Sequence, residues 1–300
     1  MRRIAFVAVA SLVVGGQAMA HVPEGEIFGA WAWPTSHLPV MDGNINEWNA
    51  LPAELWVDIF RTSVAEGDVG REIDVSNLNW RFAMGWNDEL DRLYYVFDRF
   101  DNIWDRDGGG FGCCGQDDSI EVGVDADHSG GTFWASEGTE EEIKRNRGRQ
   151  TQTAHYRWPS LPPDGWKWFW MTDADWHDQE PYACCDNSFN LNGAHGTEST
   201  FQAEWWHIAW DDFNWTDPNL SGQHDFVENE IVGIGLQVVD NDNGTEEDPN
   251  TAKWVLGGQS DIFGNSSSFS DYILLPPDWD RLPTAVEEDS WGHIKASFAN

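Results

Sequence analysis

The sequence is poor in basic residues. Only 17 Lys and Arg stand against 52 Asp and Glu in 300 residues, which gives a formal charge of -35 at pH 7. A field of that sign repels phosphate backbones and anionic membrane surfaces, so the composition speaks against nucleic acid as a partner. Such a surface also fits a halophilic setting, where acidic groups hold hydration at high salt. That hypothesis predicts unfolding at low ionic strength.

Long apolar runs are missing after the first twenty residues. At the N-terminus, Arg2 and Arg3 precede an apolar run over 4–14, and Ala18-Met19-Ala20 supplies the small residues that a signal peptidase accepts. About 11 apolar residues cannot span a bilayer core that needs roughly 20. We therefore interpret residues 1–20 as a secretory signal peptide and expect a secreted or periplasmic protein without a membrane span.

The familiar motifs of hydrolases and haem proteins are also absent. The sequence has no G-x-S-x-G elbow, no H-E-x-x-H pair and no C-x-x-C-H attachment site. With 52 acidic residues, no carboxylate pair stands out as a glycosidase centre. A non-catalytic protein is the favoured interpretation. A haem-binding redox relative that uses Met84 with a His or Lys as axial ligands is a less favoured alternative, since Met84 lies in the middle of an expected strand.

Cysteines are few and occur as two adjacent pairs, Cys113-Cys114 and Cys184-Cys185. Export would place them in an oxidising compartment, where disulfides persist. Because the eight-membered ring of a bond between neighbours strains the peptide, we expect two disulfides that join one pair to the other. A four-thiolate metal site, which normally has two to four residues between ligands, is one alternative, and free or vicinal thiols are another.

Apolar residues are plentiful: 40% of the chain is hydrophobic and 20 residues are Trp. Short β-branched and aromatic runs recur between Gly, Pro, Asp and Asn clusters, and no long segment repeats apolar residues at helical spacing. The sequence predicts an all-β, jelly-roll-like two-sheet sandwich with long loop insertions, one domain over 21–280 and a tail over 281–300. The expected strands are 55–60, 78–86, 92–98, 119–125, 151–158, 166–171, 200–210, 230–239, 252–256 and 272–275.

The expected strand at 119–125 alternates clearly. Ile120, Val122 and Val124 share one face, while Glu121 and Gly123 share the other, so one face is predicted to be core and the other solvated. Tryptophans inside expected strands are predicted to lie in the core rather than to bind ligands. They are Trp80, Trp86, Trp168, Trp170 and Trp206.

Five short motifs occur in a characteristic order. They are MDGNINEW at 41–48, RLYYVFD at 92–98, DDSIEV at 117–122, GIGLQVVD at 233–240 and FSDYIL at 269–274. In these motifs the chain resembles family 9 carbohydrate-binding modules and their DOMON-type relatives, over about residues 40–276 with large insertions. The resemblance implies a β-sandwich that holds a sugar between aromatic rings, supported by bound calcium, and implies no catalysis.

The resemblance also implies site residues. Glu121, Arg157 and Gln237 match polar sugar contacts of the family, and Phe263 matches one of its two stacking tryptophans. A stacked ring and paired hydroxyl groups are what sugar recognition needs, because an unpaired desolvated hydroxyl costs on the order of 1 to 3 kcal/mol. The alternative is that Glu121 and Arg157 form a cross-strand ion pair on a solvated sheet face.

The chain departs from the family at the second stacking ring. Gly115 stands where the family carries its other Trp, so that half of the clamp is missing or supplied by Trp104 or Phe111 on the same loop. Ser260 also replaces a family asparagine, so a sugar preference is not inherited. The second hypothesis for function is therefore a structural or surface-interaction sandwich that binds no sugar.

Two acidic turns are candidate calcium ligands, because Ca²⁺ takes six to eight oxygen ligands. Asp125 and Asp127 in DADHSG at 125–130 resemble the first half of an EF-hand loop, whose twelfth position here is Ser136. Asp240 and Asp242 form a similar turn in DNDNG at 240–244. Either turn alone also fits a solvated hairpin. The sequence predicts structural calcium, a saccharide or polysaccharide as partner, and no particular oligomeric state.

Overall fold

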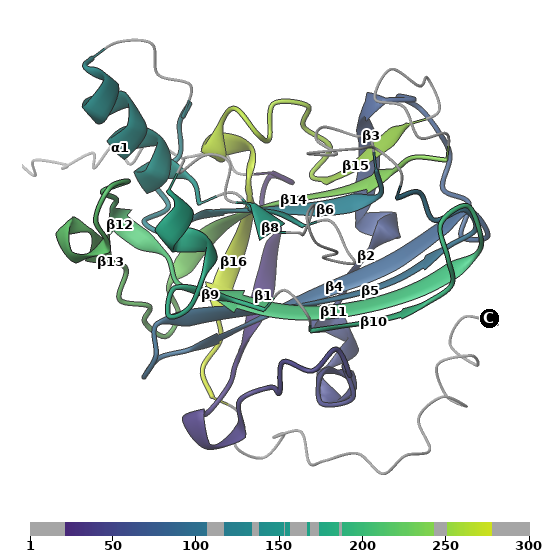
Figure 1. Cartoon of the computed structure of the whole chain (residues 1–300), viewed down its shortest axis with the longest axis horizontal. Coiled ribbons are helices and arrows are strands. Elements are labelled where there is room, and N and C mark those ends of the chain that lie inside the picture. Colours follow the sequence, from purple (N-terminus) through teal and green to yellow (C-terminus); the bar gives the residue numbers. More distant parts are fainter. Residues whose placement is uncertain are drawn as a thin grey trace, which may run out of the picture.

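The computed structural model describes residues 22–106, 117–133, 138–152, 154–156, 167–168, 174–185, 188–242 and 251–277. These residues form two layers of β-strands with one α-helix at the side (Figure 1). The predicted all-β sandwich is confirmed. The expected signal peptide at 1–20 and tail at 281–300 lie outside the described residues. Among those that are described, no helix is long and apolar enough to cross a membrane.

The first layer carries the candidate sugar site. Its antiparallel strands follow one another as β3 (Thr62–Gly67), β15 (Ala252–Leu256), β14 (Ile231–Asp240), β6 (Ser119–Asp125), β7 (Ala154–Tyr156) and β8 (Lys167–Trp168). The start of β14 also pairs with β16 (Ser270–Leu274).

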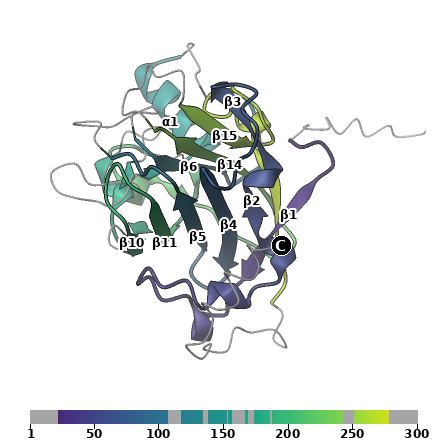
Figure 2. The same ribbon diagram turned by 90° about the vertical axis from the view of Figure 1, so that its right-hand side faces the viewer.

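The second layer lies beneath the first, and Figure 2 shows several of its strands side by side. Its main order is β10 (Phe189–Asn192), β11 (Ser199–His207), β5 (Arg92–Asp101) and β4 (Leu78–Asn87), with β2 (Val57–Asp58) on β4 and β9 (Ala183–Cys184) on β11. Strand β1 (Ile27–Ala32) runs parallel to β16 and then parallel to β4. The two layers are therefore joined along one side into a single curled sheet.

The core follows from the alternation of the strands. Ile120, Val122 and Val124 are at most 1% exposed and face the second layer's Phe82, Tyr95 and other apolar side chains in one cluster. Trp80, Trp86 and Trp206 are buried, as predicted. The side chain of Trp168 and the whole of Trp170 lie outside the described part of the chain. Met84, the candidate haem ligand, is fully buried in the same core cluster.

Three expected strands are wrong in extent, one of them at 151–158, where β7 begins only at Ala154. Over 55–60 only β2 is extended, because 3₁₀ turns at Ala53–Leu55 and Ile59–Arg61 flank it and Asp58 caps the second turn by accepting a hydrogen bond from Phe60 N. The expected strand at 200–210 ends at His207, and a separate β12 (Trp210–Asp212) pairs with β13 (Gly222–Gln223) in a small second sheet. Strands β1, β3, β9, β10 and β13 were not expected.

One helix was not expected. Helix α1 (Glu140–Gln150) begins with a capping box in which Thr139 and Glu142 each bond the other's backbone N–H. Its apolar periodicity is weak because it packs through a glycine: a Cβ at Gly148 would collide with the ring of Phe213. The T-x-x-E capping box could have been recognised in the sequence, whereas the contact of Gly148 with Phe213 could not.

The expected pairing of the cysteines stays a prediction. Cys184 and Cys185 lie with their sulfur atoms against each other and a Cα–Cα distance of 3.2 Å. Cys184 is fixed in β9, which pairs with the end of β11 opposite Trp206. The other two cysteines, Cys113 and Cys114, lie outside the described residues.

The small second sheet is tied to β14 by a histidine that predicts a pH dependence. His224 Nδ1 lies 2.6 Å from Asp211 Oδ1, and its Nε2 lies 3.2 Å from Glu230 Oε1. Burial alone lowers the pKa of His224, but hydrogen bonds and charges of Glu230 and Asp211 outweigh it and raise the pKa to about 9. The stabilisation is therefore complete below about pH 6.5 and is lost as the pH rises toward 9.

We expect His224→Gln to lower the free energy of unfolding by about 1 to 2 kcal/mol at pH 6, after allowance for solvent screening of the half-exposed Asp211. The difference from the unmodified protein should vanish near pH 9.5. Urea unfolding at several pH values measures it, and His37→Gln, at an exposed histidine, is the control. A difference that is independent of pH would contradict the charged interaction.

Candidate functional site

Two of the predicted sugar contacts lie together on the outer face of the first layer. Glu121 of β6 and Gln237 of β14 are directly opposite each other in the antiparallel register. Gln237 Nε2 donates a hydrogen bond of 3.0 Å to Glu121 Oε2. Glu121 is partly exposed and Gln237 is 6% exposed. The pair presents a carboxylate and an amide side by side, a combination that can both donate to and accept from sugar hydroxyls.

Phe263 reaches the same face through its neighbours. Val255 of β15 is directly opposite Gln237, and it belongs to a small apolar cluster with Phe133, Ile262 and Phe269. Phe263 is partly buried and packs against this cluster. The segment between β15 and β16 thus carries a phenyl ring over the sheet face on which Glu121 and Gln237 lie.

Glycines flatten this face next to the polar pair. Gly123 and Gly235 are also directly opposite each other. They form the next pair on the same sheet face after Glu121 and Gln237. A Cβ at Gly235 would lie 2.5 Å from the ring of Phe269, so glycine is what lets that ring approach the sheet. Glycine within a strand commonly marks a place where a backbone or a ligand comes close.

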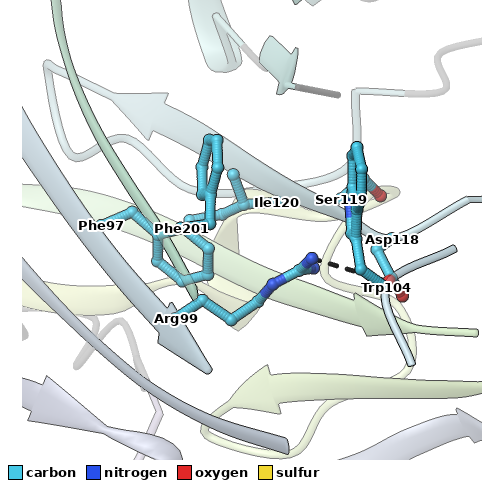
Figure 3. Close-up of a pocket in the computed structure, with 7 residues that line it drawn as sticks. All are labelled: Phe97, Arg99, Trp104, Asp118, Ser119, Ile120 and Phe201. Atoms are coloured by element: carbon cyan, nitrogen blue, oxygen red, sulfur yellow. Dashed lines mark ion pairs between the residues drawn. The ribbon is translucent and has the colours of Figure 1, made fainter. Parts of the chain in front are cut away.

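Of the other two predicted contacts, one lies outside the described residues and the other lies away from this face. Arg157 lies outside the described residues, although β7 just before it pairs with β6 and sets His155 opposite Glu121. Trp104 is 5% exposed and lines a small hollow with Arg99, Phe97 and Phe201, side chains on the inner face of the second layer (Figure 3). The structure therefore separates Trp104 from the Glu121–Gln237 pair.

The opening motif at 41–48 has a structural role that involves a residue missed by sequence reasoning. Glu204 of β11 is fully buried and accepts hydrogen bonds from Gly43 N at 2.9 Å and Trp48 Nε1 at 2.7 Å. Gly43 has a φ of +81°, and a Cβ there would collide with the backbone of Phe189. Glu204 thus anchors the motif to the outer face of the second layer, away from the sugar contacts.

A cluster of carboxylates closes one end of the sandwich. Asp240 and Asp242, at the end of β14, lie with Asp101 at the end of β5 so that one oxygen of each falls within 4.8 Å of the others. Asp118, just before β6, is also buried there. Two of these residues, Asp240 and Asp242, were predicted metal ligands. Asp101 and Asp118 were missed because only the fold brings their strand ends together.

The cluster has more negative than positive charge. Arg71 Nη1 lies 2.9 Å from Asp240 Oδ2, and Arg99 Nη2 lies 3.6 Å from oxygens of Asp101 and Asp118. Four carboxylates thus face two guanidinium groups, and Arg71 also pairs with Asp68 at 3.1 Å. Burial and the neighbouring Asp101 carboxylate raise the pKa of Asp240 to about 7 and that of Asp118 well above its usual range.

Unsatisfied oxygens in this cluster fit a cation. Asp101 Oδ2 and Asp240 Oδ1 are buried and have no hydrogen-bond partner among the described residues. Buried charges normally pair or coordinate a metal, because an isolated carboxylate is costly to remove from water. Carboxylate oxygens are the ligands that calcium prefers. The residues present therefore fit calcium at this end of the sandwich.

The other predicted metal turn is already satisfied by the protein. Asp125 accepts hydrogen bonds from Ser129 N at 3.3 Å and Gly130 N at 2.7 Å. Asp127 Oδ2 accepts from Arg149 at 3.1 Å. Both carboxylates act here as turn and helix contacts, so the acidic cluster at the sandwich end is the better match to a cation.

Comparisons with known proteins concern the fold. No family model and no curated protein matches the chain. Among solved structures it is similar to a family 9 carbohydrate-binding module from Caldicellulosiruptor kristjanssonii in complex with glucose, at 14% identity and a TM-score of 0.49, covering 85% of this chain and 97% of that one. The same module with cellotriose gives 14% identity and a TM-score of 0.48, over 86% and 98%.

A candidate carbohydrate-binding protein from Bacteroides uniformis has 10% identity and a TM-score of 0.40, over 83% of this chain and 98% of that one.

Proposed function

We propose that the protein binds a saccharide on the outer face of the first layer. The observation that carries this proposal is the hydrogen-bonded pair of Glu121 and Gln237, which lies beside the apolar cluster against which Phe263 packs. A pyranose offers hydroxyl groups at its edge and C–H groups on its face. The polar pair matches the edge, and the phenyl ring matches the face.

The five ordered motifs and the site chemistry support a binding protein rather than an enzyme. Both Glu121 and Gln237 belong to motifs shared with the family that the sequence resembles. The resemblance also implies Arg157 as a polar contact. We propose that the protein is exported and non-catalytic, in keeping with the predicted signal peptide.

We also propose that the acidic cluster holds a calcium ion. Asp101, Asp240 and Asp242 would be its protein ligands, and the ion would supply the positive charge that these buried carboxylates lack. The cluster lies at the ends of β6 and β14, the two strands that carry Glu121 and Gln237. The ion's role is therefore to fix the strand ends and not to act on the sugar.

The sugar proposal predicts a large loss of affinity when Glu121 is replaced. Calorimetric titration with glucose, cellotriose and a panel of neutral oligosaccharides, in buffer with calcium, should detect binding by the unmodified protein. Glu121→Ala should weaken it by about 10- to 100-fold, because hydrogen bonds to a charged group contribute about 1.5 to 3 kcal/mol.

The control for this variant is Glu66→Ala. Glu66 is an exposed residue of β3, two strands from β14, and pairs with Lys253 at 2.7 Å, so its loss should leave the affinity unchanged. If a broad glycan array shows no ligand for the unmodified protein, the sugar proposal fails. The mutual hydrogen bond of Glu121 and Gln237 would then favour the surface-interaction hypothesis, with the pair satisfied internally.

A further inference from the structure

Arg99 occupies an unusual position beside the acidic cluster. It lies on the inner face of β5, is 5% exposed, and extends toward Asp118 at the end of the sandwich (Figure 3). Its Nη2 is 3.6 Å from Asp101 Oδ2 and 3.6 Å from Asp118 Oδ2, beyond ordinary hydrogen-bond length. Its Nε is buried without a hydrogen-bond partner among the described residues. The guanidinium group thus interacts with the Asp101 and Asp118 carboxylates by charge, and its hydrogen-bonding capacity is not fully used.

The oxygen of Asp101 that Arg99 approaches is the one that the hydrogen bonds of the described residues leave open. Asp101 Oδ1 accepts a hydrogen bond from Ile103 N at 3.0 Å, whereas Asp101 Oδ2 has no hydrogen-bond partner in the described part of the chain. Asp101 also belongs to the group of three aspartates that could hold a metal ion. A divalent cation and the guanidinium group would therefore share one carboxylate oxygen, and each would repel the other.

Arg71 differs from Arg99 in this respect. Its Nη1 makes a short ion pair of 2.9 Å with Asp240 Oδ2, and Asn77 Nδ2 donates to the same oxygen at 3.0 Å. The other oxygen of Asp240, Oδ1, remains without a partner. Arg71 therefore orients Asp240 and leaves one of its oxygens for a ligand, while Arg99 approaches the open oxygen of Asp101 itself.

We propose that Arg99 is an internal counter-ion that competes with the divalent cation for Asp101, so that it lowers the affinity of the site and stabilises the cation-free protein. This inference rests on the proposed calcium site. According to this proposal, the site binds calcium reversibly and responds to the calcium concentration, and it does not hold its ion permanently.

The test compares calcium binding by the unmodified protein, Arg99→Met and Arg145→Met, each stripped with EDTA and then titrated with CaCl₂ in a calorimeter. Arg99→Met keeps the length of the side chain and removes its charge. We expect it to bind calcium about tenfold more tightly or better, given the size of charge repulsion at separations of a few ångströms. Arg145 pairs with Asp212 on the surface of α1, so Arg145→Met controls for total charge and should bind as the unmodified protein does.

Thermal melts give the second readout. In EDTA, Arg99→Met should melt below the unmodified protein, and saturating calcium should remove or reverse this difference. Unchanged or weaker calcium affinity in Arg99→Met would overturn the proposal, because Arg99 would then support the site. If Arg99→Met does not fold, Arg99→Gln is tested in the same way, and failure of both to fold in calcium also overturns it. Absence of calcium binding by the unmodified protein would instead remove the cation site itself.

Discussion

Replacing Glu204 by alanine at pH 5 is expected to lower the free energy of unfolding by about 3 to 5 kcal/mol. The carboxyl group accepts hydrogen bonds from Gly43 N and Trp48 Nε1, and both Glu204 and Trp48 are fully buried. Each buried donor left without a partner costs about 1 to 3 kcal/mol, and the deleted side chain leaves a cavity. Urea or thermal unfolding measures the loss. Glu198→Ala, at an exposed position of the same segment, should change it by less than about 0.5 kcal/mol.

The cost of this substitution should shrink as the pH rises. Burial, together with the nearby Glu47 carboxylate, raises the pKa of Glu204 to about 8, even though the hydrogen bonds from Trp48 and Gly43 lower it. Glu204 therefore stays protonated to a higher pH in the folded state than in the unfolded state. The free energy of unfolding of the unmodified protein consequently falls by about 2 to 4 kcal/mol between pH 5 and pH 8. Glu204→Ala has no carboxyl group at this position and does not show this loss of stability. An equal cost at pH 5 and pH 8 would show that Glu204 is not protonated in the fold.

Sequence patterns predicted the fold class and most strands because those strands alternate. β6 was predicted with its observed bounds, since Ile120, Val122 and Val124 sit at every second position of a run ended by an acidic turn. The extent of β2 could not be predicted, because Asp58 ends it through a local cap that the apolar run conceals. Helix α1 was missed because Gly148 packs against Phe213, so no apolar stripe marks its buried face.

The candidate site residues also fall into those that local sequence motifs predict and those that only the fold brings together. Glu121 and Gln237 were identified through motifs on β6 and β14, and the structure adds that they are directly opposite each other. Asp101 was not identified, because it lies 139 residues from Asp240 in the sequence and only strand order brings the two together. Local spacing suggested the turn with Asp125, whose oxygens bond the chain's own backbone. Long-range carboxylate sites need the topology, which one sequence does not supply.

Removing divalent cations is expected to lower the melting temperature by about 5 to 10 °C relative to saturating calcium. A ligand present at about 100 times its Kd stabilises the folded state by about 2.7 kcal/mol, and in a chain of roughly this size each kcal/mol corresponds to about 2 to 4 °C. Melts in EDTA and in 10 mM CaCl₂ measure the difference. Asp240→Asn should abolish it, and Asp88→Asn, at an exposed position away from the cluster, should not.

Chelation should weaken sugar binding as well, because the two sites share strands. Asp118 precedes Glu121 by three residues, and Asp240 follows Gln237 by three, so the cluster lies about 10 Å along the strands from the polar pair. Without the cation, repulsion among Asp101, Asp240 and Asp242 acts on these strand ends. Titration of one oligosaccharide with and without EDTA therefore tests the coupling, and Asp240→Asn should be insensitive to the chelator. Equal affinity in both buffers, together with a lowered melting temperature, would show that the ion stabilises the sandwich without positioning Glu121 and Gln237.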